Sequence, residues 1–304
     1  MKLKILSILI LISFHAFSQE VNYVKQPFDS IQNKEIRGLF EDSKNNVWLS
    51  TKGQGIYRTK GKKAYKMEIT NSKASNGFIS SLEDGKDLWF AARGVIKLNG
   101  KTSESLNKEK IKSTVVFSIS KDDSELIYFS GNRGVDVLDK GKWNHYNTTS
   151  GLKHQVVHDT KKDRNGNLWF ATRKGGLNML GKNNEWEYFL PNHNCRKLFE
   201  TKDGNIWIGT SSGAVLLNTS SKTTVEFNKG LSLMPQIEME DGTVLFTSEG
   251  GGLYTYDGNT WENFTTKNSS LKSNIIHAAI LTKKNKIWLG LAKGYQVIKP
   301  KLIK

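Results

Sequence analysis

Two arginines and two histidines occupy matching positions in repeated stretches of this chain, and they could bind an anion. Counting back from a recurring tryptophan motif aligns Arg37, His158, Arg196 and His277. The other copies of the motif carry Phe117, Met234 and Ile79 at this position. Arginine forms paired hydrogen bonds with carboxylate, sulfate or phosphate groups, and histidine can accept or donate a proton. If the copies form a ring, these side chains should meet near its centre.

A structural role for the same side chains remains open. Arginine and histidine can also cap the edges of packed strands, and acidic partners lie nearby in the sequence at Glu35 and Asp159. In that interpretation the basic groups are neutralised by the protein itself. The sequence alone leaves both roles possible.

The repeat that aligns these residues is clearest at residues 203–210, Asp-Gly-Asn-Ile-Trp-Ile-Gly-Thr. It combines a tight-turn signal with a short β-rich run that ends at a glycine. The aligned central residues are Trp48, Trp89, Tyr128, Trp169, Trp207, Leu245 and Trp288, spaced 38 to 43 residues apart. A period near 40 with several short strands per repeat is typical of a propeller blade.

We therefore predict an all-β, seven-bladed β-propeller with four antiparallel strands in each blade. The aligned tryptophans should fill the wedges between blades rather than bind a ligand. Residues 21–28 resemble the outermost strand of other repeats, and the last repeat lacks such a strand. We expect residues 21–28 to join the blade built from residues 275–299 and so to close the ring.

The first 18 residues have the pattern of a secretory signal peptide. Lys2 and Lys4 precede an apolar run, and Ala16-Phe17-Ser18 ends it with small residues at the cleavage positions. Residues 19–304 are then predicted to form a single domain, periplasmic or secreted, with no membrane span. Without Lys2 and Lys4 the chain keeps 43 basic against 29 acidic side chains. Cys195 is the only cysteine, so no intramolecular disulfide is expected, and a buried, inert thiol is favoured over a nucleophile.

The repeats resemble the two-component regulator propeller family. The motif Asp-x-x-Gly-Asn-x-Trp-Ile-Gly-Thr-x-x-Gly-Gly-Leu is best matched at residues 163–177, and residues 203–217 follow. The resemblance implies a periplasmic sensor propeller like those of hybrid histidine kinases, which often respond to polysaccharide-derived signals. No kinase sequence is visible in this chain, so the resemblance implies fold and compartment more strongly than signalling.

Basic side chains should gather on one face of such a propeller. Arg93, Arg133 and Arg173, with several lysines, fall in turns between predicted second and third strands, on the face where the aligned arginines and histidines should meet. The predicted ligand-binding residues are Arg37, Arg93, Arg133, His158, Arg173, Arg196 and His277. We expect a monomeric, non-enzymatic protein without cofactor or metal that binds an anionic glycan, a cell-envelope component or a protein partner. Nucleic acid would suit the charge but not the compartment.

Two other functions are compatible with the sequence. Propeller lyases resembling virginiamycin B lyase place a histidine base and a divalent metal near the central mouth, and His158 or His277, helped by Asp159 or Glu238, could be such a base. The chain contains no His-Glu-x-x-His motif. The third possibility is a scaffold in an envelope complex. Its contact surface would include three outer-strand tryptophans: Trp143, Trp186 and Trp261.

Overall fold

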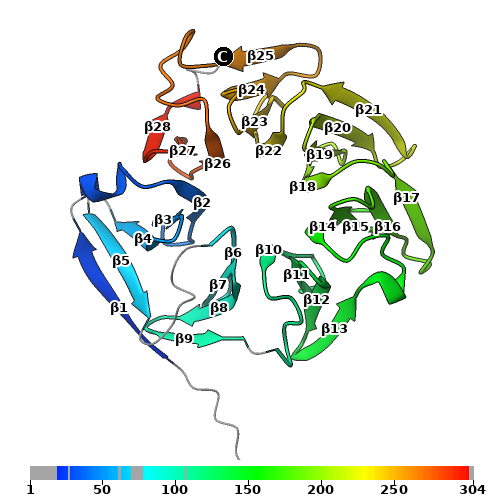
Figure 1. Ribbon diagram of the computed structural model, residues 1–304, viewed down its shortest axis with the longest axis horizontal. Coiled ribbons are helices and arrows are strands. Elements are labelled where there is room, and N and C mark those ends of the chain that lie inside the picture. Colours follow the sequence, from blue (N-terminus) through cyan, green and yellow to red (C-terminus); the bar gives the residue numbers. More distant parts are fainter. Residues whose placement is uncertain (1–18, 27, 61–62, 70–77, 107, 301–304) are drawn as a thin grey trace, which may run out of the picture.

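Strands arranged around a central opening make up nearly all of the regular structure (Figure 1). The computed structural model describes residues 19–26, 28–60, 63–69, 78–106 and 108–300, so the predicted signal peptide lies outside the described residues. Within those ranges the helices include the short 3-10 turns η1 (Phe28–Ile31) and η3 (Thr148–Ser150). No helix in the described ranges has the length and apolarity that crossing a membrane requires.

The strands hydrogen-bond into five sheets. The first contains, in order across the sheet, β2 (Ile36–Glu41), β3 (Val47–Thr51), β4 (Gly55–Lys60), β5 (Lys63–Ile69), β1 (Gln19–Gln26), β9 (Thr102–Ser105), β8 (Gly94–Asn99), β7 (Asp87–Ala92) and β6 (Ser80–Asp84). Two four-stranded sheets follow: β10 (Val116–Lys121), β11 (Ile127–Gly131), β12 (Gly134–Asp139) and β13 (Lys142–Tyr146), then β14 (Val157–Lys162), β15 (Leu168–Thr172), β16 (Leu177–Leu180) and β17 (Trp186–Phe189).

The fourth sheet has eight strands: β18 (Cys195–Glu200), β19 (Ile206–Thr210), β20 (Gly213–Asn218), β21 (Thr223–Asn228), β22 (Leu233–Glu238), β23 (Val244–Ser248), β24 (Leu253–Tyr256) and β25 (Trp261–Phe264). The last has three: β26 (Ile276–Leu281), β27 (Ile287–Leu291) and β28 (Tyr295–Ile298). All pairings between these strands are antiparallel.

The predicted fold, seven separate four-stranded blades closed by the N-terminal strand on the last blade, is wrong. The structure is an all-β propeller ring of five sheets, with nine, four, four, eight and three strands. The nine-stranded sheet forms because β1 pairs with both β5 and β9. The eight-stranded sheet forms because Thr210 on β19 pairs with Leu233 on β22. Hydrogen bonds between neighbouring repeats thus merge sheets that sequence periodicity alone treats as independent.

Residues 19–26 do form a strand, but its partner was predicted incorrectly. The alternating apolar side chains of β1 pack against the cluster around Trp48: Val21 is 2% exposed, and the Tyr23 ring centroid lies 6.4 Å from that of Trp48. The Arg58 guanidinium lies 4.3 Å from the Tyr23 ring centroid. A strand with one apolar face fits any sheet edge that offers a complementary cluster, so the alternation did not specify which edge.

The two ends of the ring are joined by packing and single hydrogen bonds rather than by a shared strand. The Lys283 backbone N–H donates to Glu41 Oε2 at 2.8 Å, and the Gly294 N–H donates to the Lys34 carbonyl at 2.7 Å. Ile36 and Tyr295 belong to one buried cluster across the same junction. These contacts bring β26 and β2 side by side (Figure 1).

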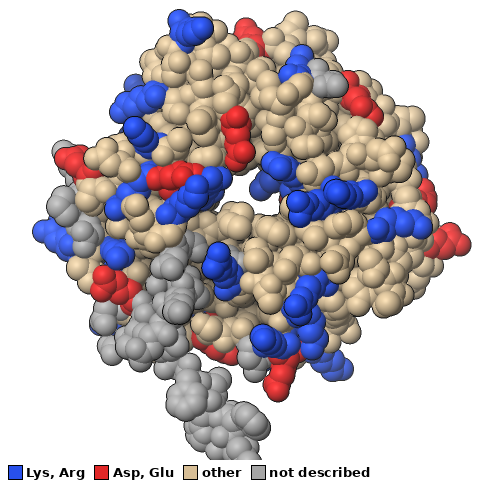
Figure 2. Space-filling model, in the orientation of Figure 1, with Lys and Arg blue, Asp and Glu red and all other residues tan. Residues whose placement is uncertain are grey.

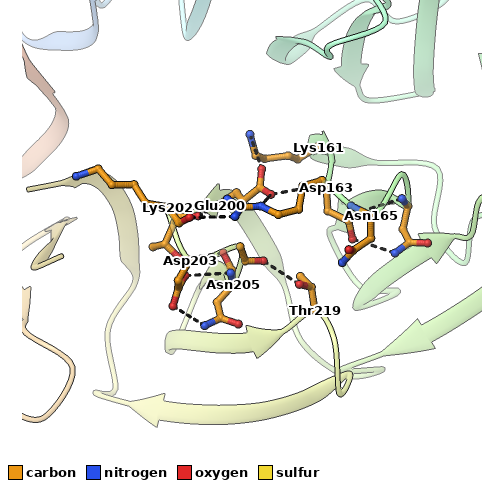
Figure 3. Close-up of polar contacts among 12 residues, drawn as sticks. Lys161, Asp163, Asn165, Glu200, Lys202, Asp203, Asn205 and Thr219 are labelled. Carbon is orange, nitrogen blue, oxygen red and sulfur yellow. Dashed lines mark hydrogen bonds and ion pairs between the residues drawn. The ribbon is translucent and has the colours of Figure 1, made fainter.

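The Glu41 contact is one copy of a link that recurs around the ring. The first strand of each repeat is its inner strand, nearest the central opening (Figure 1). At each copy of the link, a residue in the turn after one inner strand donates its backbone N–H to a glutamate in the inner strand of the next repeat around the ring. The pairs are Ser43 with Glu83 at 2.6 Å, Arg164 with Glu200 at 3.3 Å and Lys202 with Glu238 at 2.8 Å. Figure 3 shows the link at Glu200. Several acidic side chains on this face are therefore used to hold neighbouring inner strands together.

The aspartate at the start of the repeat motif positions both the turn and the tryptophan. Asp163 Oδ1 accepts the N–H groups of Asn165 at 2.9 Å (Figure 3) and Asn167 at 2.8 Å. Its Oδ2 accepts Trp169 Nε1–H at 2.8 Å. Asp42 bonds Trp48 in the same way, at 2.9 Å. In the repeat where leucine replaces tryptophan, at Leu245, methionine replaces this aspartate, at Met239. The aspartate is not tied to the tryptophan in every repeat, because Thr201 precedes Trp207 and Thr282 precedes Trp288 at the same spacing.

The aligned aromatic side chains fill the core between the strands of neighbouring repeats, as predicted. The strands of one repeat, such as β14–β17, form one strand group. Trp48, Trp89, Trp169 and Trp207 are all buried. The outer-strand tryptophans are half-buried, with Trp186 packed on Phe170 at 5.4 Å between ring centroids.

Candidate functional site

A cavity of about 740 Å³ lies at the centre of the ring. It is lined by residues of the inner strands β2, β6, β10, β14, β18, β22 and β26. All residues aligned by the sequence repeat lie on its wall: Arg37, Ile79, Phe117, His158, Arg196, Met234 and His277. The structure therefore brings together four of the predicted site residues, two arginines and two histidines.

β-Bulges hold most of these side chains in place. The pairing register skips one residue in five inner strands at the aligned position, and those residues are Arg37, Phe117, His158, Arg196 and His277. In β22 the skipped residue is Gln236 instead, two positions after Met234. A bulge leaves its extra residue outside the ladder and re-aims the side chain, and bulges are frequent beside functional sites. The sequence alignment found the position, but no signal in the sequence distinguished a bulge from a regular strand residue.

The aligned residues line the mouth of this cavity. On the β2 side of the mouth, acidic side chains of the protein neutralise the basic ones. The Arg37 guanidinium pairs closely with Glu35, and its second nitrogen lies 3.5 Å from Glu249 Oε1. Lys52 Nζ lies 3.2 Å from the other Glu35 oxygen. Arg37 thus has the structural role that the sequence left open, as the ion-pair partner of Glu35. The second partner, Glu249, was not predicted from the sequence.

His277 sits between the same two carboxylates. Its side chain is 6% exposed, with Nε2 3.3 Å from Glu35 and Nδ1 3.5 Å from Glu249. Neither ring nitrogen has the angles of a hydrogen bond with any described residue, so these contacts are electrostatic proximity only. Burial lowers the pKa of His277, and the Arg37 guanidinium lowers it further, against the opposing effect of the carboxylates.

The β14 and β18 side of the mouth is different, because no ion pair to a described residue neutralises Arg196. Arg196 also forms part of a small polar recess of about 40 Å³, together with Ser232, Glu249 and His277. The His158 ring lies 5.0 Å from Phe117 between ring centroids. Burial lowers the pKa of His158 to about 4, and Arg196 and Arg173 add to the effect by repulsion. His158 is therefore neutral at physiological pH, beside two arginines.

Replacing His158 tests this environment. The folded-state pKa of about 4 lies below the ordinary value of 6.5, so the unfolded chain takes up the proton first as the pH falls. Stability from this residue is complete above the unfolded pKa and is lost as the pH drops towards the folded pKa. Between about pH 7 and pH 5 the wild-type free energy of unfolding should fall about 1–2 kcal/mol more than that of His158→Gln. Urea unfolding at both pH values measures this, and equal losses would contradict it.

The remaining predicted residues lie in exposed turns. Arg93 is in the turn between β7 and β8, Arg133 between β11 and β12, and Arg173 between β15 and β16. Arg173 is close enough to act electrostatically on His158. Figure 2 shows basic side chains beside the opening over β14 and β18, whereas acidic side chains lie among basic ones on the β2 side. Arg196 on the cavity wall and Arg173 both act on His158, and the ion pairs among the described residues include neither arginine.

The carboxylates considered as helpers of a histidine base have other roles. Asp159 is buried and accepts hydrogen bonds from Ser118 Oγ at 2.5 Å and the Leu198 N–H at 2.9 Å. Glu238 accepts the Lys202 N–H in the link described above. Neither carboxylate bonds His158. Within the described ranges, no group of three or more His, Cys, Asp or Glu side chains is placed to hold a metal ion.

Cys195 is a buried residue of β18, as the sequence favoured. It is 0% exposed, and burial raises the pKa of its thiol to about 12. Because the thiolate is the reactive form, iodoacetamide at about pH 8 should leave the native protein unlabelled but label it fully in denaturant. Intact-mass spectrometry measures both states, and rapid labelling of the native protein would show that Cys195 is accessible.

Comparison with known proteins finds matches to propeller repeats and to propeller structures. The family described as two component regulator propeller matches residues 30–53, 151–174 and 190–212. Histidine kinase P4 of Formosa agariphila is 24% identical over 159 residues, which is 45% of this chain and 12% of the kinase. The chain thus matches a small part of that curated relative.

Two solved structures show how widely the fold is shared. The extracellular domain of the putative hybrid two component system BT3049 from B. thetaiotaomicron superposes with a TM-score of 0.77 at 21% identity, covering 91% of this chain and 42% of that chain. A catalytically inactive virginiamycin B lyase from Staphylococcus aureus, solved with quinupristin, superposes with a TM-score of 0.71 at 13% identity, covering 92% of this chain and 98% of that chain. At these identities the likeness establishes the fold and no activity.

Proposed function

Because the chain carries repeats of the two-component regulator propeller family, we propose that it is an exported, non-enzymatic binding propeller whose channel mouth holds an anionic ligand. The observation that carries the proposal is the set of bulged residues at the channel mouth, where Arg196 has no ion pair to a described residue. The likeness to an extracellular sensor domain supports the compartment.

An acidic glycan matches the chemistry of this mouth. Its carboxylate or sulfate groups would accept hydrogen bonds from Arg196 and Arg173. Neutral His158 can donate or accept a hydrogen bond from a sugar hydroxyl. The half-buried Phe117 ring on the same wall offers an apolar surface for a sugar ring. A glycan with acidic groups and an accessible sugar ring would contact the whole β10–β18 side of the mouth.

Binding is favoured over a lyase reaction by the carboxylate contacts. A histidine base needs a partner that orients it, and Asp159 and Glu238 are already bonded to other groups. The likeness to virginiamycin B lyase is one of fold. We therefore assign no reaction to the site.

A glycan-array screen at two salt concentrations tests the proposal. At about 50 mM salt the protein should retain carboxylated or sulfated glycans, and retention should fall strongly at about 500 mM, because salt screens exposed charges. Neutral glycans of the same length are the control. Selective retention of neutral glycans, or retention of acidic ones that salt does not change, would count against the proposal.

A further inference from the structure

In the described part of the chain, no strand pairs with the outer edge of the three-stranded sheet β26–β28, where other repeats carry an outer strand. The third strand of every other repeat pairs with a fourth one: β4 with β5, β8 with β9, β12 with β13, β16 with β17, β20 with β21 and β24 with β25. Among the described residues, β28 pairs with β27 alone. The strand that the sequence suggested for this edge, β1, lies between β5 and β9.

The loop beside β28 does not take the place of the absent strand. The Lys272 N–H donates to Gln296 Oε1 of β28 at 3.0 Å. The same contact exists at Asp136 of β12 and Asn178 of β16, at 3.1 and 2.9 Å. Both of those strands still pair with an outer strand. The loop contact and an outer strand are therefore compatible on the same third strand.

The backbone of β28 presents hydrogen-bonding groups at this edge. The Leu291 N–H donates to the Gly294 carbonyl at 3.0 Å, which makes that pair the hydrogen-bonded one. Because hydrogen-bonded and non-bonded pairs alternate along an antiparallel ladder, Gln296 and Ile298 turn their backbone groups towards β27. Val297 turns its N–H and C=O outward, and its residue is 38% exposed. Such an edge is a template for an additional strand.

Two outer strands of this chain, β17 and β25, indicate which sequence fits. In β17, Trp186 lies opposite Leu180 and Phe189 lies opposite Leu177. In β25, Trp261 and Phe264 lie in the same register against Tyr256 and Leu253. An aromatic pair three residues apart thus packs against the last and first residues of the third strand. At β28 the equivalent residues are Ile298 and Tyr295.

A hollow of about 400 Å³ adjoins the end of β28. Met239 and Leu281 give it an apolar wall, and Pro300 borders it just beyond the strand. Its charged lining residues are Glu240, Lys284, Lys286 and Lys299. The hollow therefore suits a large apolar side chain with an acidic neighbour, as in the Trp-Glu sequence of β17 and β25.

We propose that β28 receives an extended, acidic segment of a partner protein, which pairs antiparallel with it and places two aromatic residues three positions apart opposite Ile298 and Tyr295. The partner would complete the sheet through backbone hydrogen bonds from Val297. This site lies at the outer edge of the ring, so it is separate from the channel mouth and independent of ligand binding there.

A labelled peptide with the sequence of residues 183–190, Asn-Asn-Glu-Trp-Glu-Tyr-Phe-Leu, tests the proposal by fluorescence anisotropy. It should bind the wild-type protein saturably, and hydrogen exchange at the Val297 amide should slow when it is bound. Val297→Pro removes the outward N–H while keeping the pairs with β27, and should weaken binding by about tenfold or more. Val297→Thr keeps the N–H and should stay within about twofold. The matched control is the same peptide with serine in place of its tryptophan and its phenylalanine.

Several outcomes would overturn this assignment. They are no saturable binding to the wild type, equal binding of the serine peptide, and unchanged exchange at Val297. If Val297→Pro does not fold, as judged by circular dichroism, the exchange measurement on the wild type and the Lys286→Glu/Lys299→Glu variant decide. That variant should bind the peptide about tenfold more weakly than the wild type. Its affinity should recover when both glutamates of the peptide are replaced by lysine. If the protein forms a concentration-dependent dimer in which the Val297 amide is protected without any peptide, a second copy of the chain occupies the edge. That result would refute the proposal of a partner segment.

Discussion

Trp169→Ala is expected to lower the free energy of unfolding by about 3–5 kcal/mol, the usual cost of removing a large, fully buried aromatic side chain. Trp169 is 0% exposed and packs in a cluster with Leu177, Ile206 and Ile208, between two neighbouring strand groups. Its loss leaves a cavity in that cluster and also removes the Nε1–H that Asp163 accepts at 2.8 Å. Urea denaturation followed by circular dichroism measures the change.

Two further variants separate packing from hydrogen bonding at Trp169. Trp169→Phe keeps most of the buried apolar area but leaves one Asp163 oxygen without its indole donor, at a cost of about 1–3 kcal/mol. Tyr188→Ala changes an exposed aromatic residue of the same strand group and should cost less than about 1 kcal/mol. If Trp169→Ala cost no more than Tyr188→Ala, the tryptophan motif would not be the packing unit described above.

The double variant Arg173→Gln/Arg196→Gln should weaken binding of an acidic oligosaccharide by about 100-fold or more. A hydrogen bond to a charged group contributes about 1.5–3 kcal/mol, and each arginine can supply at least one. No ion pair to another described residue competes for Arg196, so its charge is available to a ligand. Isothermal titration calorimetry with tetragalacturonate measures the affinity, and neutral cellotetraose is the control ligand.

A matched control variant removes two positive charges elsewhere. Lys140 and Lys182 are exposed in turns between third and fourth strands, on the opposite face of the ring from Arg173. Lys140→Gln/Lys182→Gln lowers the net charge by the same amount but should change the affinity by less than about threefold, because charges farther than a Debye length of about 10 Å are screened. Equal losses in the two double variants would mean that net charge, rather than the mouth, attracts the ligand.

The sequence predicted the repeat and its core well, because both depend on local signals. The Asp163-to-Trp169 spacing requires a turn and a strand in that order, and the tryptophan then contacts its own turn. The aligned inner-strand residues followed from counting along this motif. Arg37, His158, Arg196 and His277 line one cavity because each is a fixed number of residues before an aligned tryptophan of the repeat.

The sequence failed where neighbours compete for the same strand. Val21 and Tyr23 on β1 could have packed against several edges, and the cluster around Trp48 and Met67 stabilises one of them. The number of sheets also depends on single backbone pairs such as Thr210 with Leu233, which carry no sequence signature. Periodicity counts repeats, whereas hydrogen bonds between repeats decide how many sheets result.

Charge pairing at the mouth was equally invisible from the sequence. Glu249 comes from the β23–β24 turn, more than two hundred positions from Arg37 in the chain, and only the ring brings it within 3.5 Å. The β-bulges that aim Arg196 and His158 also need the neighbouring strand for their definition. The uneven charge of the mouth, neutralised near β2 and positive near β18, is therefore a property of the assembled ring.

A crystal structure of the protein with bound tetragalacturonate tests the central claim most directly. The account predicts that a carboxylate of the sugar lies within hydrogen-bonding distance, about 3 Å, of the Arg196 guanidinium, with a sugar ring beside His158 and Phe117. Density for the sugar on the outer edge of the ring or on the opposite face, with Arg196 still exposed to solvent, would contradict it.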